Sequence, residues 1–304
     1  MKSIRLGVMR NWVVGAAVIL SFGLAEFSQA FEIPTSPRAR AAVTKVEPTL
    51  ARDLRVVGLQ LGAPLFIRVF KKSAELEVWV EDRTGRYSLF RTYDICDYSG
   101  RLGPKIKQGD MQSPEGFYYV TAEQLNPQSY FHLSFNLGYP NAFDQGLGRT
   151  GGNLMIHGDC VSTGCYAMTD DKIEEIYTLV ESALRRGQRD FPVHVFPFRM
   201  TDRAMYRFRR SPWIDFWHNL KQGYDLFEQD RRPPFVAVTN DRYVFATPDD
   251  VQIRIADDVE ARIAARMAAN LNRSAKGKSK RADIKPIRDV EPVKASMGIQ
   301  IPGE

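Results

Sequence analysis

Alternating hydrophobic and polar positions dominate the first two thirds of the chain and predict β-strands. Residues 65–70 (Leu-Phe-Ile-Arg-Val-Phe) and 76–80 (Leu-Glu-Val-Trp-Val) are separated by a polar turn, and the second segment alternates as a half-buried strand does. The pattern continues at residues 117–121 and 131–137, with Gly and Pro residues marking the turns between segments. A mostly β region is therefore predicted over residues 55–198.

A helix is predicted to interrupt these strands near residue 170. Thr169 and the two aspartates after it offer an N-cap and a negative first turn, and Gly187 follows the last turn. An apolar stripe runs between these ends, formed by Ile173, Ile176, Tyr177, Val180 and Leu184. A further strand is predicted over residues 193–198.

After residue 200 the helical period takes over. Ser211-Pro212 is typical of a helix start. The apolar residues after it recur every three or four positions, as on a core-facing helix, and are Trp213, Trp217, Leu220, Tyr224 and Phe227. Residues 236–238 and 243–245 flank Asn240-Asp241 and predict a hairpin, and Thr247-Pro248 predicts another helix start.

The ends of the chain differ in composition from its middle. Residues 1–30 carry a basic start, an apolar run from Trp12 to Leu24 and small residues ending at Ala30, a pattern typical of a secretory signal peptide. An uncleaved N-terminal anchor is the alternative interpretation. We expect a linker over residues 31–50, a catalytic domain over residues 51–200, a helical extension packed on it over residues 201–271, and a basic, disordered tail over residues 272–304.

Bulk composition adds little beyond this. The chain has 304 residues, 44% of them hydrophobic and 26% charged, with a net charge of +6 and a pI of about 9.2. These values are ordinary for a globular protein, and the basic balance favours anionic surroundings without choosing among them. No segment after the N-terminal run is long and apolar enough to span a membrane. We therefore expect a soluble mature protein outside the cytoplasm, with the membrane involved only through the signal peptide.

The segment from Asn153 to Met168 carries the most informative chemistry. An apolar run leads into His157, a Gly- and Ser-containing loop follows, and Cys165 comes next. If the flanking segments pair as antiparallel strands, His157 and Cys165 face each other across the loop, with Cβ atoms about 5 Å apart. A neighbouring imidazolium lowers the pKa of a thiol, and the thiolate is the nucleophile. The amides near Gly164 and the hydroxyl of Ser162 are candidates for stabilising an oxyanion.

Two alternatives for this segment remain open. A zinc site built from His157, Asp159, Cys160 and Cys165 is one, although its spacing matches no common zinc pattern. A structural Cys160–Cys165 disulfide is the other, since an oxidising compartment pairs thiols. The favoured pairing joins Cys96 to Cys160, because it leaves Cys165 free.

These residues resemble the catalytic motif of the L,D-transpeptidase (YkuD-type) family, in a shortened form similar to murein endopeptidase-like members. The motif is the His157-Gly158 pair followed by Ser162-Thr-Gly-Cys165. Upstream segments resemble the family as well: Leu102-Gly103-Pro104-Lys105, Gly109-Asp110, Ser113-Pro-Glu-Gly-Phe117, Asn136-Leu-Gly-Tyr-Pro-Asn141 and Gly148-Arg149-Thr-Gly151. The resemblance implies a mainly β (α+β) fold, with a curved catalytic sheet and few helices.

The resemblance also implies roles and partners. Cys165 would be the acylated nucleophile and His157 its base, with the carbonyl of Gly158 orienting the imidazole. The substrate would be a peptidoglycan stem peptide containing diaminopimelate, with no cofactor and no nucleic acid involved. An outer-membrane protein or lipoprotein attached to the wall is a further expected partner.

The motif also departs from the family pattern. Four residues (158–161) separate the His157 position from Ser162, where the family has a longer gap; Thr163 replaces a second histidine, and Ala167 replaces an arginine. Recognition of the substrate carboxylate is therefore assigned to Arg149. The other candidate substrate contacts are Tyr139, Asp159, Thr163 and Tyr166.

Three functions fit these observations. The first is a transpeptidase that cross-links stem peptides or attaches a protein to the wall. The second is an amidase or endopeptidase that hydrolyses such bonds, and the third is an inactive peptidoglycan-binding module. The remaining histidines are expected to be structural in strands (His132 and His194) or at the surface (His218).

Overall fold

The computed structural model describes residues 33–251 and Arg262. The predicted signal peptide and the predicted tail lie outside the described residues. In chain order the elements are α1 (Pro37–Val56), β1 (Leu65–Phe70), β2 (Glu75–Glu81), β3 (Tyr87–Asp94), β4 (Asp97–Tyr98), β5 (Gly116–Thr121), η1 (Ala122–Gln124), β6 (Leu125–Asn126), β7 (Ser134–Asn136), α2 (Ala142–Gly146), β8 (Met155–His157), β9 (Tyr166–Ala167), α3 (Asp170–Arg185), β10 (Asp190–Phe196), α4 (Asp202–Arg207), α5 (Ile214–Asp230), β11 (Phe235–Thr239) and β12 (Arg242–Ala246).

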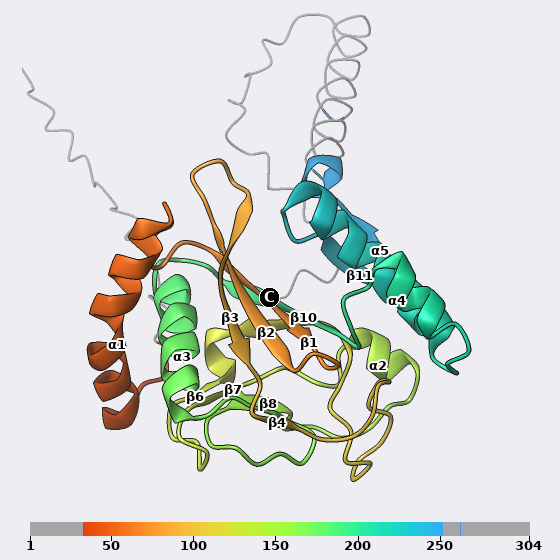
Figure 1. The fold of residues 1–304 in the computed structure, drawn as a ribbon, viewed down its shortest axis with the longest axis horizontal. Helices are drawn as coiled ribbons and strands as arrows, with labels where there is room; N and C mark the ends of the chain where they lie inside the picture. Colours follow the sequence, from red (N-terminus) through yellow and green to blue (C-terminus); the bar gives the residue numbers. More distant parts are fainter. Residues whose placement is uncertain (1–32, 252–261, 263–304) are drawn as a thin grey trace, which may run out of the picture. The chain divides into compact units, whose positions relative to one another are not determined.

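Two five-stranded sheets form the centre of the fold (Figure 1). The first has the order β3-β2-β1-β10-β5, in which only the β1–β10 pair is parallel. The second has the order β4-β9-β8-β7-β6 and contains one parallel pair, β8–β9. The predicted mainly β, α+β fold class is confirmed.

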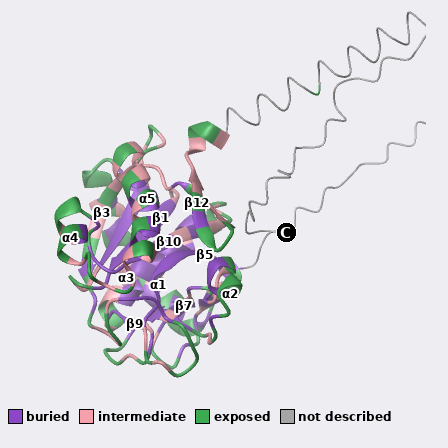
Figure 2. Ribbon diagram, turned by 90° about the vertical axis from the view of Figure 1, so that its right-hand side faces the viewer, coloured by how far each residue is buried: buried purple, intermediate pink, exposed green. Residues whose placement is uncertain are grey.

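Strand β1 is buried along its whole length because both faces of the first sheet are covered (Figure 2). Side chains alternate between the faces of a strand. Leu65, Ile67 and Val69 join the main core with α1, α3 and the second sheet. The other three residues of β1 face helix α5, where Arg68 bonds Glu228 at 2.7 Å. The first sheet therefore forms the middle layer between α5 and the rest of the core.

The prediction of a linker over residues 31–50 is wrong, because helix α1 begins at Pro37 within that range. The Ser36 hydroxyl accepts a bond from the Ala39 amide and donates to the carbonyl of Pro127 at 2.7 Å, so it caps the helix and docks it. The buried stripe consists partly of alanines, and Pro48 lies inside the helix. Neither small alanine side chains nor an internal proline gives the pattern of large apolar residues that predicts a core-facing helix. The sequence therefore did not predict α1.

The strand predicted over residues 131–137 is shorter than expected, and β7 begins only at Ser134. His132 has a φ of +65°, which breaks the extended conformation. The amide of Gly158 bonds the carbonyls of both Phe131 and Leu133, at 3.0 and 3.1 Å. This irregular segment therefore lies against the residue that follows His157.

Residues 202–246 pack on the first sheet. Helix α5 begins at Ile214, slightly after the predicted Ser211-Pro212 start, and Trp217, Leu220 and Tyr224 are buried against Phe70 and other aromatic residues of the sheet. The predicted hairpin is confirmed as β11–β12, with Asn240 and Asp241 both at positive φ as a two-residue turn requires.

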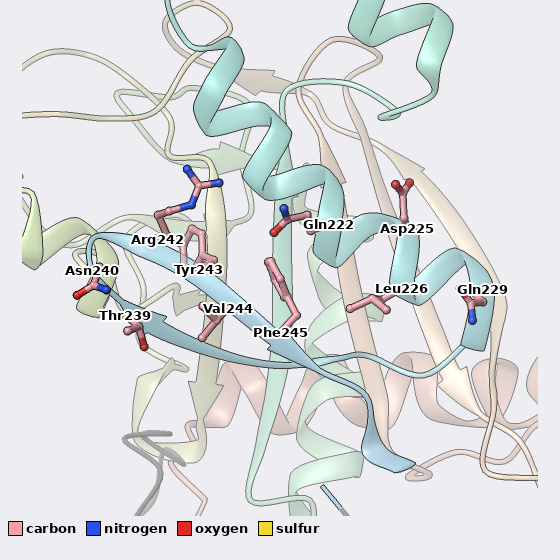
Figure 3. Close-up of a pocket in the computed structure, with 10 residues that line it drawn as sticks. All are labelled: Gln222, Asp225, Leu226, Gln229, Thr239, Asn240, Arg242, Tyr243, Val244 and Phe245. Atoms are coloured by element: carbon pink, nitrogen blue, oxygen red, sulfur yellow. The ribbon is translucent and has the colours of Figure 1, made fainter. Parts of the chain in front are cut away.

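A groove of about 740 Å³ separates α5 from this hairpin on the outer surface (Figure 3). Gln222 and Leu226 of α5 line one side, and Tyr243 and Phe245 of β12 line the other. None of the candidate site residues from the sequence lines it. Within residues 33–251, no helix combines the length and apolar character that a bilayer crossing requires.

If α1 belongs to the core, truncating its buried face must destabilise the whole protein. Leu54 is fully buried and Val56, two residues away, is 80% exposed. We expect Leu54→Ala to lower the free energy of unfolding by about 2–5 kcal/mol, and Val56→Ala to change it by less than about 0.5 kcal/mol. Urea denaturation measures both, and equal effects would restore the linker interpretation.

Candidate active site

Strands β8 and β9 place the two residues that the sequence predicted as base and nucleophile. They pair in parallel, with Ile156 opposite Tyr166 and His157 opposite Ala167. The expectation of antiparallel flanks is therefore wrong, because the chain returns through residues 158–165 and runs in the same direction again. His157 is the last residue of β8, and Cys165 immediately precedes β9.

Cys165 is the free cysteine of the described chain, and its side chain is partly exposed. Its Sγ accepts a bond from the Met155 amide at 3.4 Å and donates to the Asn153 carbonyl at 3.8 Å. Its own carbonyl accepts from two hydroxyls, those of Ser113 at 3.0 Å and Ser162 at 2.8 Å. Ser162, a residue predicted for the site, thus contacts the backbone of the predicted nucleophile. Ser113 makes a second such contact, which the sequence did not predict.

His157 is buried, and a main-chain carbonyl fixes its orientation. Its Nδ1 lies 2.5 Å from the carbonyl oxygen of Gly158, as the resemblance implied. A carbonyl can only accept, so Nδ1 carries the proton and Nε2 of the neutral ring is left as the basic nitrogen. The ring of Phe131 lies against the imidazole, with centroids 4.7 Å apart. The sequence predicts Phe131 only as part of a strand and gives no sign of its contact with His157.

Burial shifts the pKa values of both groups in the direction that favours their neutral forms. It lowers the pKa of His157, which the bond to the Gly158 carbonyl opposes. It also raises the pKa of the Cys165 thiol, opposed by the Met155 amide and the charge of Lys105. Among the described hydrogen bonds there is none between His157 and Cys165. Both shifts oppose the imidazolium–thiolate pair that the sequence suggested.

Gly164 has a structural function that differs from the predicted one. Its amide donates to the hydroxyl of Ser99 at 2.6 Å, so this amide is not free to bind an oxyanion. Its φ of +100° is a conformation that favours glycine. An added Cβ would also lie 3.2 Å from Leu154. Gly164 therefore permits the sharp approach to Cys165, and the oxyanion role of the Cys165 amide stays a prediction.

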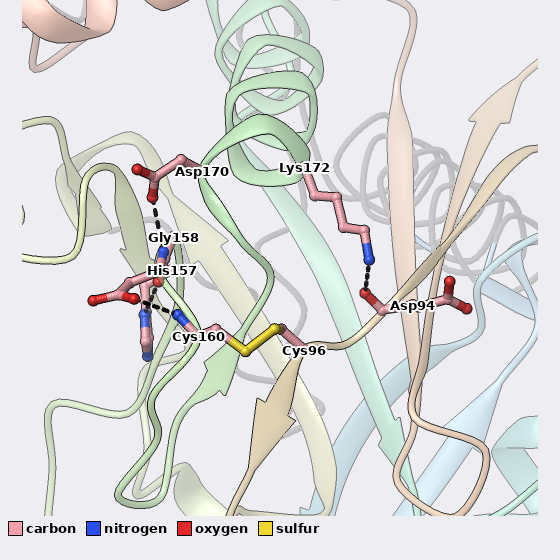
Figure 4. The surroundings of a disulfide bond; sticks show 8 residues. Asp94, Cys96, His157, Gly158, Cys160, Asp170 and Lys172 are labelled. Carbon is pink, nitrogen blue, oxygen red and sulfur yellow. Dashed lines mark hydrogen bonds between the residues drawn. A yellow bond between two sulfur atoms is a disulfide. The ribbon is translucent and has the colours of Figure 1, made fainter.

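A disulfide joins Cys96 to Cys160 and confirms the favoured pairing (Figure 4). The alternative Cys160–Cys165 disulfide is wrong, and the zinc alternative loses Cys160 as a ligand. The bond ties the loop after His157 to the residue before β4, and the Cys96 amide also donates to the Ala167 carbonyl at 2.7 Å. The loop of residues 158–165, which we call the catalytic loop after its predicted role, is thus anchored to the edge of the second sheet.

The predicted substrate contacts divide into buried and exposed residues. Tyr166 is fully buried and donates to the Pro114 carbonyl, so its assignment to the substrate groove is wrong. Arg149 is buried and bonds Asp144 at 2.7 Å, which already neutralises its charge and removes the reason to assign it to a substrate carboxylate. Tyr139 is mostly buried and donates to the Lys105 carbonyl. Asp159 and Thr163 are exposed on the catalytic loop.

The loop of residues 99–115 contributes more to the site than the sequence suggested. Asp110 organises it by accepting bonds from the Lys105 ammonium at 2.6 Å and from the amides of Ile106, Lys107 and Gln112. These bonds lower the pKa of Asp110, although burial opposes them. The Gly109-Asp110 turn was visible in the sequence, but nothing there showed that it orders a loop beside Cys165.

His194 and His218 have the predicted strand and surface positions, whereas His132 lies before β7 and not in a strand. His132 bonds Glu174 of α3 at 2.9 Å, and His194 is fully buried among Phe66, Phe117 and Phe196. His218 is exposed on α5.

Comparison with known proteins agrees with this geometry. Residues 66–195 match the family described as L,D-transpeptidase catalytic domain (YkuD). The "Putative L,D-transpeptidase YafK" of Escherichia coli K12 is 50% identical over 188 residues, which are 62% of this chain and 76% of that protein. The protein of the same name from Escherichia coli O157:H7 matches equally.

Two solved structures are more distant. The helical cell shape determining protein Pgp2 from Campylobacter jejuni is 22% identical with a TM-score of 0.34; the match covers 48% of this chain and about half, 54%, of Pgp2. Bd1075 from Bdellovibrio bacteriovorus is 18% identical with a TM-score of 0.32, covering 59% of this chain and 78% of Bd1075.

A neutral resting thiol has a clear signature in its reactivity. Because burial raises the pKa of Cys165, we expect its rate of alkylation by iodoacetamide to keep rising with pH through about 8.5, the ordinary thiol value. Mass spectrometry of quenched samples between pH 5 and 10 measures the rate, with Cys165→Ser as the blank. A midpoint below about pH 7 would instead indicate a resting thiolate.

The disulfide is expected to stabilise the fold. It joins residues 64 positions apart, and the double variant Cys96→Ser/Cys160→Ser should lower the free energy of unfolding by about 2–4 kcal/mol. Urea denaturation measures this difference, with Cys165→Ser as a variant that keeps the disulfide. An unchanged free energy in the double variant would show that the loop needs no covalent anchor.

Proposed function

We propose, from the premise that the chain belongs to the L,D-transpeptidase family, that it is a cell-wall enzyme forming a thioester between Cys165 and a peptidoglycan stem peptide. The observation that carries this proposal is the arrangement at β8 and β9. It places a partly exposed thiol just before β9 and a buried imidazole at the end of the neighbouring strand β8, with Nδ1 of that imidazole bonded to the Gly158 carbonyl and Nε2 left as the basic nitrogen. These groups supply a nucleophile and a matched base.

The first chemical step uses both groups. Sγ attacks the carbonyl carbon of the scissile amide, and the thiol proton passes to Nε2 of His157. The resulting imidazolium keeps its Nδ1–H bond to the Gly158 carbonyl, which stabilises the positive charge. The C–N bond then breaks, the leaving amine takes the proton from Nε2, and the acyl group remains on sulfur as a thioester.

The second step decides the reaction type. In transpeptidation, the amine of a second stem peptide or of a wall-attached protein attacks the thioester; His157 accepts the amine's proton and returns it to the departing sulfur. In hydrolysis, water takes the place of that amine. Transpeptidation is the activity we propose first, and hydrolysis is the alternative that the products can reveal.

Substrate recognition is proposed for the exposed part of the catalytic loop. The Asp159 carboxylate accepts the Cys160 amide through one oxygen and is otherwise open to solvent. A diaminopimelate stem peptide carries an ammonium group that such a carboxylate can bind. Thr163, also exposed on this loop, offers a hydroxyl as a second polar group. The expected location is the periplasm, where the wall and its attached lipoproteins are found.

Purified peptidoglycan sacculi carrying attached lipoprotein provide the test. Incubation with the full chain should yield new cross-links or exchanged terminal residues, read by mass spectrometry of the muropeptides. Cys165→Ala should reduce product formation by at least about a thousandfold, because it removes the atom that forms the covalent intermediate.

The double variant Cys96→Ser/Cys160→Ser is the matched control, since it loses two sulfurs and keeps Cys165. It should still form the same products at temperatures where it is folded, but more slowly, because the loop after His157 loses its covalent anchor. Released lipoprotein or shortened peptides that are absent with Cys165→Ala would show that the enzyme hydrolyses its substrate and does not transpeptidate it. The same products from the wild-type chain and Cys165→Ala would overturn the enzyme assignment in favour of a binding module.

A further inference from the structure

A buried hydrogen bond joins helix α5 to the strand that leads away from the catalytic loops. The indole Nε1 of Trp217 donates to Oε2 of Glu115 at 2.8 Å. Trp217 is 1% exposed and Glu115 is fully buried. Glu115 immediately precedes β5 and lies 102 positions before Trp217. The carboxylate thus depends on a residue from outside the 66–195 family match.

The other oxygen of Glu115 holds the loop of residues 99–115. Its Oε1 accepts the amide of Gly103 at 2.7 Å and lies 3.2 Å from the ammonium of Lys71. Lys71 is fully buried as well, and burial lowers its pKa while the charge of Glu115 opposes this. A buried ammonium needs its counter-ion and its acceptors together.

The ammonium of Lys71 extends the network to both ends of the loop. It donates to the carbonyls of Arg101, Gly103 and Ser113 at 2.8 to 2.9 Å. All three donor positions of the ammonium are therefore directed at main-chain carbonyls. Lys71 and Glu115 together fix where Ser113 lies.

The next contact in this network joins the Ser113 side chain to the main chain of Cys165. Its hydroxyl donates to the carbonyl of Cys165 at 3.0 Å, and the Ser99 amide donates to the same hydroxyl at 3.3 Å. Ser99 in turn accepts the Gly164 amide. A continuous set of hydrogen bonds, with one ion pair, thus runs from α5 to the main chain of Gly164 and Cys165.

We propose that Trp217 is a positioning residue for the cysteine reaction: through Glu115, Lys71 and Ser113 it fixes the main chain that carries the Cys165 thiol. Without the indole N–H, a carboxylate oxygen of Glu115 is buried with no donor. The carboxylate then gains by rotating toward another donor, and this rotation weakens its hold on Gly103 and Lys71. The segment of residues 202–246 is on this account part of the catalytic apparatus.

The chain offers a matched control for this bond. Trp79 also donates its indole N–H to a buried glutamate, Glu77, at 2.9 Å. It lies on β2 and packs against Phe227, and its bond leads to none of the residues around Cys165. Trp217→Phe and Trp79→Phe therefore remove the same group from similar surroundings.

The experiment measures the iodoacetamide alkylation rate of Cys165 between pH 5 and 10 in the full chain, well below the melting temperature of each variant. We expect Trp217→Phe to lower the rate by about tenfold and to shift the pH midpoint, because small displacements of reacting groups are costly in rate. Trp79→Phe should reproduce the wild-type profile while lowering the melting temperature by a similar amount. Iodoacetamide needs no peptidoglycan, so this readout is independent of the proposed function.

Ser113→Ala provides a second variant, since it cuts the last bond of the same path. The double variant Trp217→Phe/Ser113→Ala should react no more slowly than the slower single variant, because residues in one network are not additive. A wild-type rate and midpoint in Trp217→Phe, or fully additive losses in the double variant, would overturn the proposal. Equal kinetic losses in Trp79→Phe and Trp217→Phe would also overturn it, by showing a general effect of core damage.

Discussion

The buried ion pair between Lys71 and Glu115 is the contact on which the catalytic region depends. Both side chains are fully removed from water, so each charge requires the other and every remaining donor and acceptor must find a partner. Those partners are the main chain of the loop of residues 99–115 and the indole of Trp217. Because an unpaired buried charge is costly, these bonds hold the loop of residues 99–115 in one conformation. The loop in turn places the Ser113 hydroxyl 3.0 Å from the Cys165 carbonyl.

A second constraint acts on the opposite side of the nucleophile. The disulfide at Cys160 anchors the loop that follows His157, and the Gly158 carbonyl sets the proton on Nδ1 of that histidine. Burial shifts the pKa values of the Cys165 thiol and the His157 imidazole in the direction that favours their neutral forms. In the proposed mechanism these two groups carry out the proton transfer that accompanies attack on the substrate carbonyl.

Local patterns predicted the parts of this structure that are set locally. The alternation in β2, the apolar stripe of α3 and the Asn240-Asp241 turn are each set by residues close together in the chain. The motif that contains His157 and Cys165 is also continuous in the chain, and the catalytic roles of the two residues stay predictions. The parts that escaped prediction depend on residues distant in sequence. The parallel pairing of β8 and β9, the burial of Tyr166, the neutralisation of Arg149 by Asp144 and the capture of the Gly164 amide by Ser99 are decided by tertiary packing.

The most direct test of this account is whether the sulfur of Cys165 becomes acylated. The full chain would be mixed with a tetrapeptide stem containing diaminopimelate, quenched in acid within seconds, digested, and examined by mass spectrometry. The account predicts an added mass equal to the acyl part of the peptide on the fragment that contains Cys165, and its loss on treatment with hydroxylamine. Product formation without any adduct on that fragment, or an adduct on another residue, would contradict it.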